Sequence, residues 1–562
     1  MDAILRHLKN KNIIIKNKLL FYFLLLLSTP CLSQTRQDTL ALIEKAMRIY
    51  LPQNPGCQLS IKRNGEIIFS KAYGMADLEH NVPLTLTSKI EAGSVSKQFT
   101  AAAILLLEQQ RKLSLNDDVR KYIPELPDYG YVITLEQMMH HTSGLRDWGS
   151  VAELTGWGRT TKNYNNDDVL EIIKAQKALN NIPGAEFIYS NSNYNLLAII
   201  VQRVSGQSLA EFTKQNIFIP AGMTNTEWRD NHNRIVKDRA IAYRLTKNGY
   251  ETLMPNEDAY GNGALLTTTE DLLKWNDFYQ SGKLGTSSLI LKQTKVEAFK
   301  NGKMNDYGAG LYIQKFKGQN LIQHSGATAG YRAFLETFPD INLSVAFLSN
   351  TSQFDNSFYR VSTMRDIFIA EKNKPTINTT DIKISVSKTL LNAYTGWYRN
   401  ERDGSSTNIE VMNGSLFMDN GLLIPQSEKK FKITASQKLV EINDTKEMLL
   451  IISDRDTIYY TKAETPIVDN QYLEKYVGKF FSTETNSTIK VYLKDGKLMI
   501  NLKPNNDYEL NPTYKDGFNI TDMVSISFLG GNLYFIKNRR NEIETMKVSN
   551  SRARNIKYEK LK

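Results

Sequence analysis

Hydrophobic and polar positions change their spacing along the chain. Between residues 34 and 371, stretches with helical spacing such as 99–110 alternate with short β-rich runs such as 58–61 and 343–348. This mixture predicts an α/β or α+β domain. Residues 372–387 are polar and carry no helical period, so we expect a linker there.

After the predicted linker, short alternating runs predict an all-β region. Asn-Gly at 413–414 and Asp-Gly at 495–496 are typical of tight hairpin turns. The pattern Leu-x-x-Tyr-x-Gly-x-Tyr at 391–398 recurs at 473–480 with Phe in the last position, and a hairpin follows each copy. We therefore expect two related β units, either as separate small barrels or as two halves of one sheet structure.

The first 33 residues have the layout of a signal peptide. A basic stretch runs into the apolar residues 19–27, and a proline with small residues follows. The apolar run is short for a permanent membrane anchor. We expect export to the periplasm or the medium with cleavage near Ser33, the alternatives being an uncleaved anchor or lipidation at Cys31. The predicted division is a signal peptide at 1–33, a mixed domain at 34–371, a linker at 372–387 and β units at 388–466 and 467–562.

The charge and the residue types give no reason to expect a nucleic acid, a metal or another cofactor. The formal net charge is +11, of which the first 33 residues contribute five basic side chains against one acidic, leaving +7 for the rest without a dense basic stripe. The six histidines show no ligand spacing. After cleavage only Cys57 remains, so no internal disulfide is possible.

Ser94 and Lys97 form the central chemical signal, an S-x-x-K motif directly before the helical run. Three residues apart at the start of a helix, they lie on one face and can touch. A buried lysine with a lowered pKa takes the proton of a hydroxyl, and a helix N-terminus favours developing negative charge. The pair is a candidate nucleophile and base, although the motif alone also fits a serine near a surface lysine.

Tyr189 and Asn191 form a Y-x-N motif at a predicted turn between an extended and a helical segment. A phenol beside a lysine can relay the serine proton to a leaving group, and an amide can bind both the lysine and a substrate carbonyl. By itself the motif also fits a buried tyrosine and a turn asparagine.

The third motif is predicted to be a strand edge that lines a cleft. Its backbone N–H groups, together with that of the nucleophile, can form an oxyanion hole. An isolated histidine here would more often be structural, but the other two motifs assign it to the serine site. The motif comprises His324, Ser325, Gly326 and Ala327.

In this order the three motifs resemble the S-x-x-K, Y-x-N and K-T-G set of penicillin-binding proteins and class C β-lactamases. The resemblance covers roughly residues 40–371 and extends to three further stretches at 141–145, 261–275 and 307–310, which we interpret as turns and helix caps that shape the cleft. It implies a β-lactamase/transpeptidase-like domain, with an antiparallel sheet flanked by helices, before the β units.

The resemblance also implies a role for each site residue. Ser94 is acylated, Lys97 acts as its base and Tyr189 shuttles the proton. Asn191 positions the substrate, and the N–H of Ala327 completes the oxyanion hole. Water then releases the acyl group.

The third motif departs from the family pattern because His324-Ser325-Gly326 replaces K-T-G. A cationic lysine there helps to bind the carboxylate of β-lactams and D-Ala-D-Ala ends, and a mostly neutral histidine binds it more weakly. The H-x-G form followed by two β units looks more like D-stereospecific aminopeptidases and related esterases. A loop from one β unit is expected to reach over the cleft and limit substrate size.

We therefore expect an exported serine hydrolase that acts on small peptides or esters. Three alternatives remain: β-lactamase activity, D-Ala-D-Ala carboxypeptidase activity, and a non-catalytic envelope protein that binds peptidoglycan or another protein. The intact Ser94, Lys97 and Tyr189 favour the enzyme. The sequence does not indicate the oligomeric state.

Overall fold

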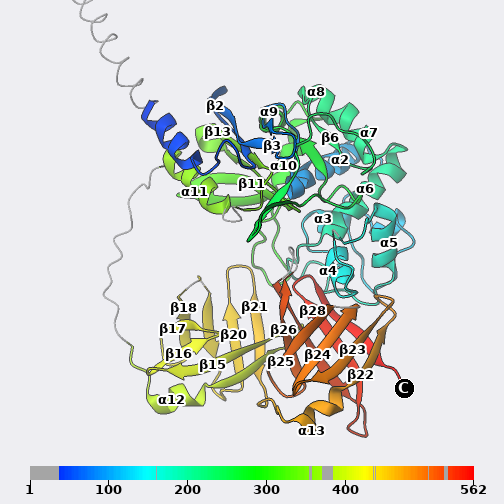
Figure 1. Cartoon of the computed structure of the whole chain (residues 1–562), viewed down its shortest axis with the longest axis vertical. Helices are drawn as coiled ribbons and strands as arrows, with labels where there is room; N and C mark the ends of the chain where they lie inside the picture. The colour runs from blue at the N-terminus through cyan, green and yellow to red at the C-terminus, as the bar shows by residue number, and fades with distance from the viewer. Residues whose placement is uncertain are drawn as a thin grey trace, which may run out of the picture.

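The computed structural model describes residues 37–159, 161–353, 357–369, 384–434, 436, 438–503, 506–524 and 529–562. The predicted signal peptide lies outside these residues, as does the predicted linker apart from residues 384–387. The mixed domain occupies the upper half of Figure 1, and two β-barrels lie side by side below it. No helix in the described part of the chain has the length and apolar character needed to cross a membrane.

A six-stranded antiparallel sheet forms the centre of the mixed domain, with the strand order β10-β11-β12-β13-β1-β2. The N-terminal pair of strands thus completes a sheet whose other four strands come from the end of the domain. The predicted β-rich runs fall in β1 and β13, which pair directly. The bounds are β1 Cys57–Arg63, β2 Glu66–Tyr73, β10 Tyr312–Phe316, β11 Gln319–Thr328, β12 Tyr331–Phe338 and β13 Leu343–Ser349.

Helices cover both faces of this sheet because successive strand residues point to opposite sides. Phe334 and Phe347 pack into a core that includes side chains from the helix at 37–47 and from α11 (Ser357–Phe368). Leu335 and Leu348 pack into the other core, which contains the central helices of the domain. The fold class predicted for this domain is therefore confirmed.

Several helices and short strands surround the second core. The helical segments are η1 Gly93–Ser96, α2 Lys97–Gln109, η2 Val119–Lys121, α3 Leu135–Met139, α4 Trp148–Glu153, α5 Asn166–Lys174, α6 Asn191–Ser205, α7 Leu209–Thr213, η3 Lys214–Phe218, α8 Ile219–Ala221, α9 Thr269–Gln280, α10 Ser287–Thr294 and η4 Pro339–Ile341. The short strands are β3 Met75–Asp77, β4 Val82–Pro83, β5 Ile90–Glu91, β6 Glu227–Trp228, β7 Tyr243–Thr246, β8 Gly249–Thr252 and β9 Leu265–Thr267.

The C-terminal region forms two separate closed barrels, each of eight antiparallel strands. Of the two arrangements that the sequence allowed, the β units form separate small barrels and not two halves of one sheet structure. The first barrel follows α12 (Lys388–Ala393) and contains β14 Gly396–Asn400, β15 Ser406–Met412, β16 Ser415–Met418, β17 Gly421–Pro425, β18 Lys430–Ile433, β19 Leu439–Ile442, β20 Met448–Ile452 and β21 Thr457–Lys462. The second follows α13 (Asn470–Leu473) and η5 (Glu474–Tyr476) and contains β22 Gly478–Ser482, β23 Ser487–Lys494, β24 Lys497–Lys503, β25 Asn506–Pro512, β26 Gly517–Val524, β27 Leu529–Lys537, β28 Ile543–Asn550 and β29 Ala553–Lys560.

The repeated motif begins each barrel, and its aromatic side chains pack inside. Tyr394 and Tyr398 are buried in the core of the first barrel, and Tyr476 and Phe480 are buried in the core of the second. The predicted Asn-Gly hairpin joins β15 to β16, and its Asn413 adopts the left-handed conformation with φ 51°. Two equivalent sequence patterns thus produce two equivalent barrels.

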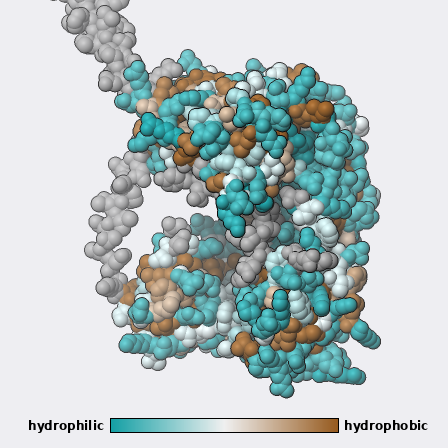
Figure 2. Space-filling view, in the orientation of Figure 1, coloured by the Kyte–Doolittle hydropathy of each residue, from teal (hydrophilic) through white to brown (hydrophobic). Residues whose placement is uncertain are grey.

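The second barrel packs against the mixed domain below α4 (Figure 1). Val151 and Leu154 of the mixed domain share a buried cluster with the core of this barrel. Beside them, Arg146 and Glu484 form a buried ion pair between the two domains. The face of the molecule seen in Figure 2 is hydrophilic over most of its area, with hydrophobic residues in scattered groups.

Candidate active site

Ser94 and Lys97 lie where the turn η1 runs into α2. Ser94 is partly exposed, whereas Lys97 is fully buried. The Lys97 Nζ lies 3.0 Å from the Ser94 Oγ. The predicted contact between these two side chains is therefore present, and it results from their spacing at the start of a helix.

The Lys97 ammonium group has two further acceptors inside the domain. Its Nζ donates to the Asn191 Oδ1 at 2.9 Å and to the backbone carbonyl of Asn262 at 2.5 Å. Burial, followed by the positive charges of Arg159 and Arg552, holds the pKa of Lys97 well below its ordinary value. A buried, hydrogen-bonded lysine of this kind can accept a proton from the neighbouring serine.

Tyr189 and Asn191 lie at the N-terminus of α6. The Lys97 Nζ is 4.8 Å from the centre of the Tyr189 ring, and a side-chain hydrogen bond links Tyr189 to Ser94. Burial raises the pKa of Tyr189 above its ordinary value, and the bond to Ser94 acts in the opposite direction. The backbone N–H of Asn191 donates to the Asp147 Oδ2 at 2.6 Å, which fixes the start of the helix.

His141 packs with its ring against the Tyr189 ring. Its ring lies 4.2 Å from the Tyr189 ring, centre to centre, and its backbone carbonyl accepts a hydrogen bond from Ile188. Its Nδ1 accepts a hydrogen bond from the backbone N–H of Ser190 at 3.2 Å. His141 is fully buried, and desolvation lowers its pKa well below the ordinary value. This neutral ring therefore packs against Tyr189 and helps to orient it.

His324 lies on β11 with its side chain buried among tyrosines. Its Nδ1 lies 2.6 Å from the backbone carbonyl of Ser325, so this nitrogen carries the proton and donates. Its Nε2 then accepts a hydrogen bond from the Tyr307 hydroxyl at 2.9 Å. Burial, followed by the charge of Lys97, lowers the pKa of His324 to about 3. The imidazole is therefore neutral, and both of its nitrogens have partners.

The rest of the third motif lies against the nucleophile. The pairing of β10 with β11 ends at Gln323, so beyond this residue β11 pairs only with β12. A Cβ on Gly326 would lie 3.0 Å from the Ser94 N and 2.0 Å from the Ala92 carbonyl oxygen. A Cβ on Gly93 would lie 2.8 Å from the Ala327 N. Two glycines thus permit the close approach of the Ser94 turn to this strand.

Sequence reasoning did not find three residues of this site. Asn262 belongs to a Gly-Asn-Gly stretch that was interpreted only as a turn, yet its carbonyl accepts from Lys97. Asp147 and Arg552 carry no motif that marks them. The guanidinium carbon of Arg552, from the second barrel, lies 4.7 Å from the centre of the Tyr189 ring.

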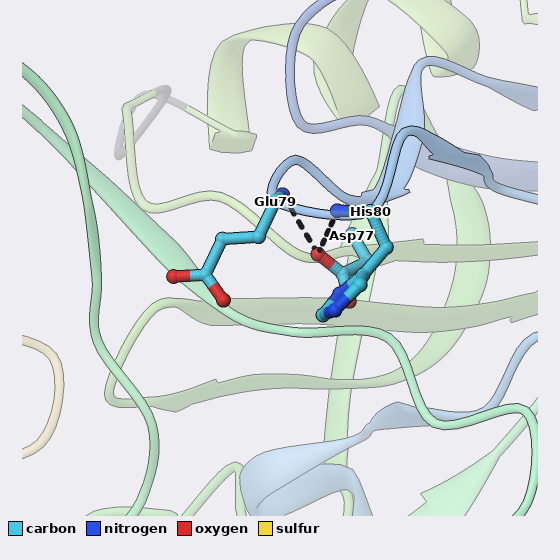
Figure 3. A group of neighbouring side chains, drawn as sticks. All are labelled: Asp77, Glu79 and His80. Atoms are coloured by element: carbon cyan, nitrogen blue, oxygen red, sulfur yellow. Dashed lines mark hydrogen bonds and ion pairs between the residues drawn. The ribbon is translucent and has the colours of Figure 1, made fainter.

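One group of metal-ligand residue types lies elsewhere, on β3 and the turn that follows it (Figure 3). Asp77 accepts hydrogen bonds from the backbone N–H groups of Glu79 and His80 and lies 2.8 Å from the His80 Nδ1. Glu79 and His80 are exposed. The hydrogen bonds to Asp77 close the turn, and they explain why these three residues lie together.

The matched family model is Beta-lactamase, over residues 42–363. Protein flp of Staphylococcus aureus (strain MRSA252) is 31% identical over 305 residues, which are 53% of this chain and 59% of that protein. The match thus spans about three fifths of the length of that relative. Penicillin-binding protein 4* of Bacillus subtilis (strain 168) is 28% identical over 414 residues, which are 67% of this chain and 87% of that protein.

Solved structures share the fold. The octameric penicillin-binding protein homologue from Pyrococcus abyssi has a TM-score of 0.52 and 23% identity, covering 83% of this chain and 98% of that one. A D-stereospecific amidohydrolase from Streptomyces sp. has a TM-score of 0.50 and 19% identity, covering 58% and 98%. The family match covers more than half of the 562 residues. The chain therefore belongs to the beta-lactamase family.

Proposed function

We propose that this protein is an exported hydrolase that cleaves amide or ester bonds through an acyl-enzyme on Ser94. The observation that carries the proposal is the buried Lys97, whose Nζ lies 3.0 Å from the Ser94 Oγ and 2.9 Å from the Asn191 Oδ1. Ser94 is thus one of three hydrogen-bond partners of the Lys97 side chain. The lowered pKa of Lys97 suits it to take up a proton at neutral pH.

In the proposed mechanism, Lys97 takes the proton of the Ser94 hydroxyl as the Oγ attacks the substrate carbonyl carbon. The N–H groups of Ser94 and Ala327 donate to the resulting oxyanion. Tyr189, hydrogen-bonded to Ser94, donates its hydroxyl proton to the leaving amine or alkoxide as the bond between that group and carbon breaks, and the proton held by Lys97 then restores the Tyr189 hydroxyl. In deacylation, water gives a proton to Lys97 as it attacks the acyl carbon, the bond from that carbon to the Ser94 Oγ breaks, and the Oγ takes up the proton as the acid leaves.

The proposed substrates are short peptides, in particular those that contain D-amino acids, with esters next. Two observations support this choice. The structural neighbours include a D-stereospecific amidohydrolase and a D-amino acid amidase from Ochrobactrum anthropi. His324 is neutral and internally hydrogen-bonded, so the third motif offers no side-chain cation to a β-lactam carboxylate. Asn191 and the backbone of 324–327 would position the substrate.

The test compares the purified protein with its Ser94→Ala variant on a short-chain nitrophenyl ester, D-alanine nitroanilide and a chromogenic cephalosporin. We expect the native protein to turn over the nitroanilide or the ester, and the relative rates on the three compounds identify the preferred substrate class. The Ser94→Ala variant should lose at least about 10³-fold in rate, because the acyl-enzyme no longer forms. Equal activity of both proteins would identify another nucleophile, and equal inactivity would favour a binding protein.

A further inference from the structure

The turn between the last two strands of the second barrel reaches the active site. β28 ends at Asn550 and β29 begins at Ala553, and Arg552 lies between them. The Arg552 guanidinium carbon lies 4.7 Å from the centre of the Tyr189 ring, within the range of a cation–π contact. Since Tyr189 is hydrogen-bonded to Ser94, this cation lies next to the position of a bound substrate.

Hydrogen bonds hold the backbone of this turn in place. The carbonyl of Arg552 accepts from the Asp147 N at 3.1 Å and from the Asn180 Nδ2 at 2.8 Å. The backbone N–H of Arg554 donates to the Asn180 Oδ1 at 2.8 Å, and its guanidinium donates to the Glu186 Oε2 at 2.9 Å. The Arg552 side chain therefore projects from a fixed wall of the site, which reduces the entropy lost when it binds a ligand.

The second barrel contributes a positive charge, that of Arg552, beside Tyr189. In the third motif a neutral His324 stands where the K-T-G enzymes have a lysine, and its ring lies 6.3 Å from that of Tyr189. Arg552 lies against the same tyrosine and lowers the pKa of Lys97, after burial and Arg159. The guanidinium charge of Arg552 thus lies close to both Tyr189 and Lys97.

We propose that Arg552 is the anion-binding residue of this active site and selects substrates that carry a carboxylate next to the scissile bond. A guanidinium fork donates two parallel hydrogen bonds to a carboxylate. The inference rests on the proposed acyl-transfer function. It makes the second barrel part of the active site.

The test uses N-acetyl-D-alanyl-D-alanine and its C-terminal amide, which differ in the charge of one group. For the acid, Arg552→Gln should lower kcat/KM by roughly 10- to 100-fold, the loss expected for a charge-assisted hydrogen bond. For the amide it should change kcat/KM by less than about threefold, and Arg552→Lys should recover part of the loss for the acid. The matched control is Arg455→Gln, which removes the same charge from the first barrel, where Arg455 lies over Phe187 and pairs with Asp306.

Two kinetic outcomes would overturn the inference. An equal loss for acid and amide would indicate that Arg552 only supports the fold, and no loss for either would indicate that it does not meet the substrate. Thermal unfolding of each variant separates the first outcome from misfolding, and Arg552→Lys keeps the charge if the glutamine variant is unstable.

A binding experiment separates this inference from the proposed function. In the Ser94→Ala protein, calorimetric titration should show tighter binding of the acid than of the amide, and the added Arg552→Gln change should abolish that preference. Native protein that is inert towards both compounds, while the Ser94→Ala protein still prefers the acid, would contradict the proposed function and support Arg552. Turnover of esters by the native protein, with no tighter binding of the acid than of the amide, would support the proposed function and contradict the role of Arg552.

Discussion

At the scale of single residues, the protonation states around Ser94 follow from desolvation. Burial disfavours the ammonium form of Lys97, so its pKa falls, and it disfavours the phenolate form of Tyr189, so that pKa rises. Burial thus shifts both groups towards their neutral forms. A deprotonated Lys97 beside the serine hydroxyl can act as a base, and the protonated Tyr189 beside it can act as an acid.

The pH dependence of kcat/KM tests this assignment. A base acts in its deprotonated form, so we expect kcat/KM for a nitrophenyl ester to rise with pH through a midpoint well below the ordinary lysine value of 10.5. Because the Tyr189 pKa is raised, the rate should not fall before about pH 10. Lys97→Met should lose about 10²- to 10⁴-fold. A rise centred near 10.5 would contradict the role of Lys97.

At the scale of elements, α4 and the start of α6 connect the catalytic groups to the second barrel. The Asp147 N–H donates to the Arg552 carbonyl, and the Asp147 carboxylate accepts from Asn191, whose amide oxygen accepts from Lys97. This chain of hydrogen bonds runs from the barrel to the nucleophile. The barrel therefore contributes a hydrogen bond to the network that holds the α6 N-terminus.

The buried pair of Arg146 and Glu484 should control this docking. Glu484 also accepts from the backbone N–H groups of Lys177 and Lys557 at 2.9 and 3.1 Å. Glu484→Gln leaves Arg146 buried without its counter-charge, which typically costs about 3 to 5 kcal/mol. We expect a lower unfolding midpoint and faster proteolysis between the domains.

The control is Glu559→Gln, which removes an exposed carboxylate from the same barrel. This change should leave both measurements within error, because exposed ion pairs contribute little. Unchanged stability of Glu484→Gln would show that the ion pair does not hold the domains together.

At the scale of the whole molecule, the mixed domain depends on the barrel that follows it. Val151 and Leu154 are buried against the barrel core and become exposed without it. Removal of residues 467–562 should therefore lower the solubility of the protein and reduce turnover even of a small nitrophenyl ester. The loss should exceed that of Arg552→Gln, because Asp147 also loses a partner. Full turnover by soluble truncated protein would show that the barrel is dispensable.

The spacing of residues along the chain accounts for the structural features that were predicted from short stretches of sequence. Ser94 and Lys97 meet because they lie three positions apart at a helix start, and Tyr189 and Asn191 fall on either side of one helix N-terminus. The alternating runs, the Asn413-Gly414 turn and the repeated motif likewise specify hairpins by local geometry. These features depend on neighbours in the sequence, so a single sequence suffices to predict them.

Contacts between distant segments were decided by the tertiary structure alone. The closure of two separate barrels depends on pairing between first and last strands, which no local pattern encodes. The neutral state of His324 depends on its burial against Tyr307. Arg552 follows a strand with no motif around it, and it reaches Tyr189 only because the barrel docks below α4. The sequence by itself determined the contact between Ser94 and Lys97, and the packing of domains determined the charge around this pair, because electrostatic fields depend on distance in space.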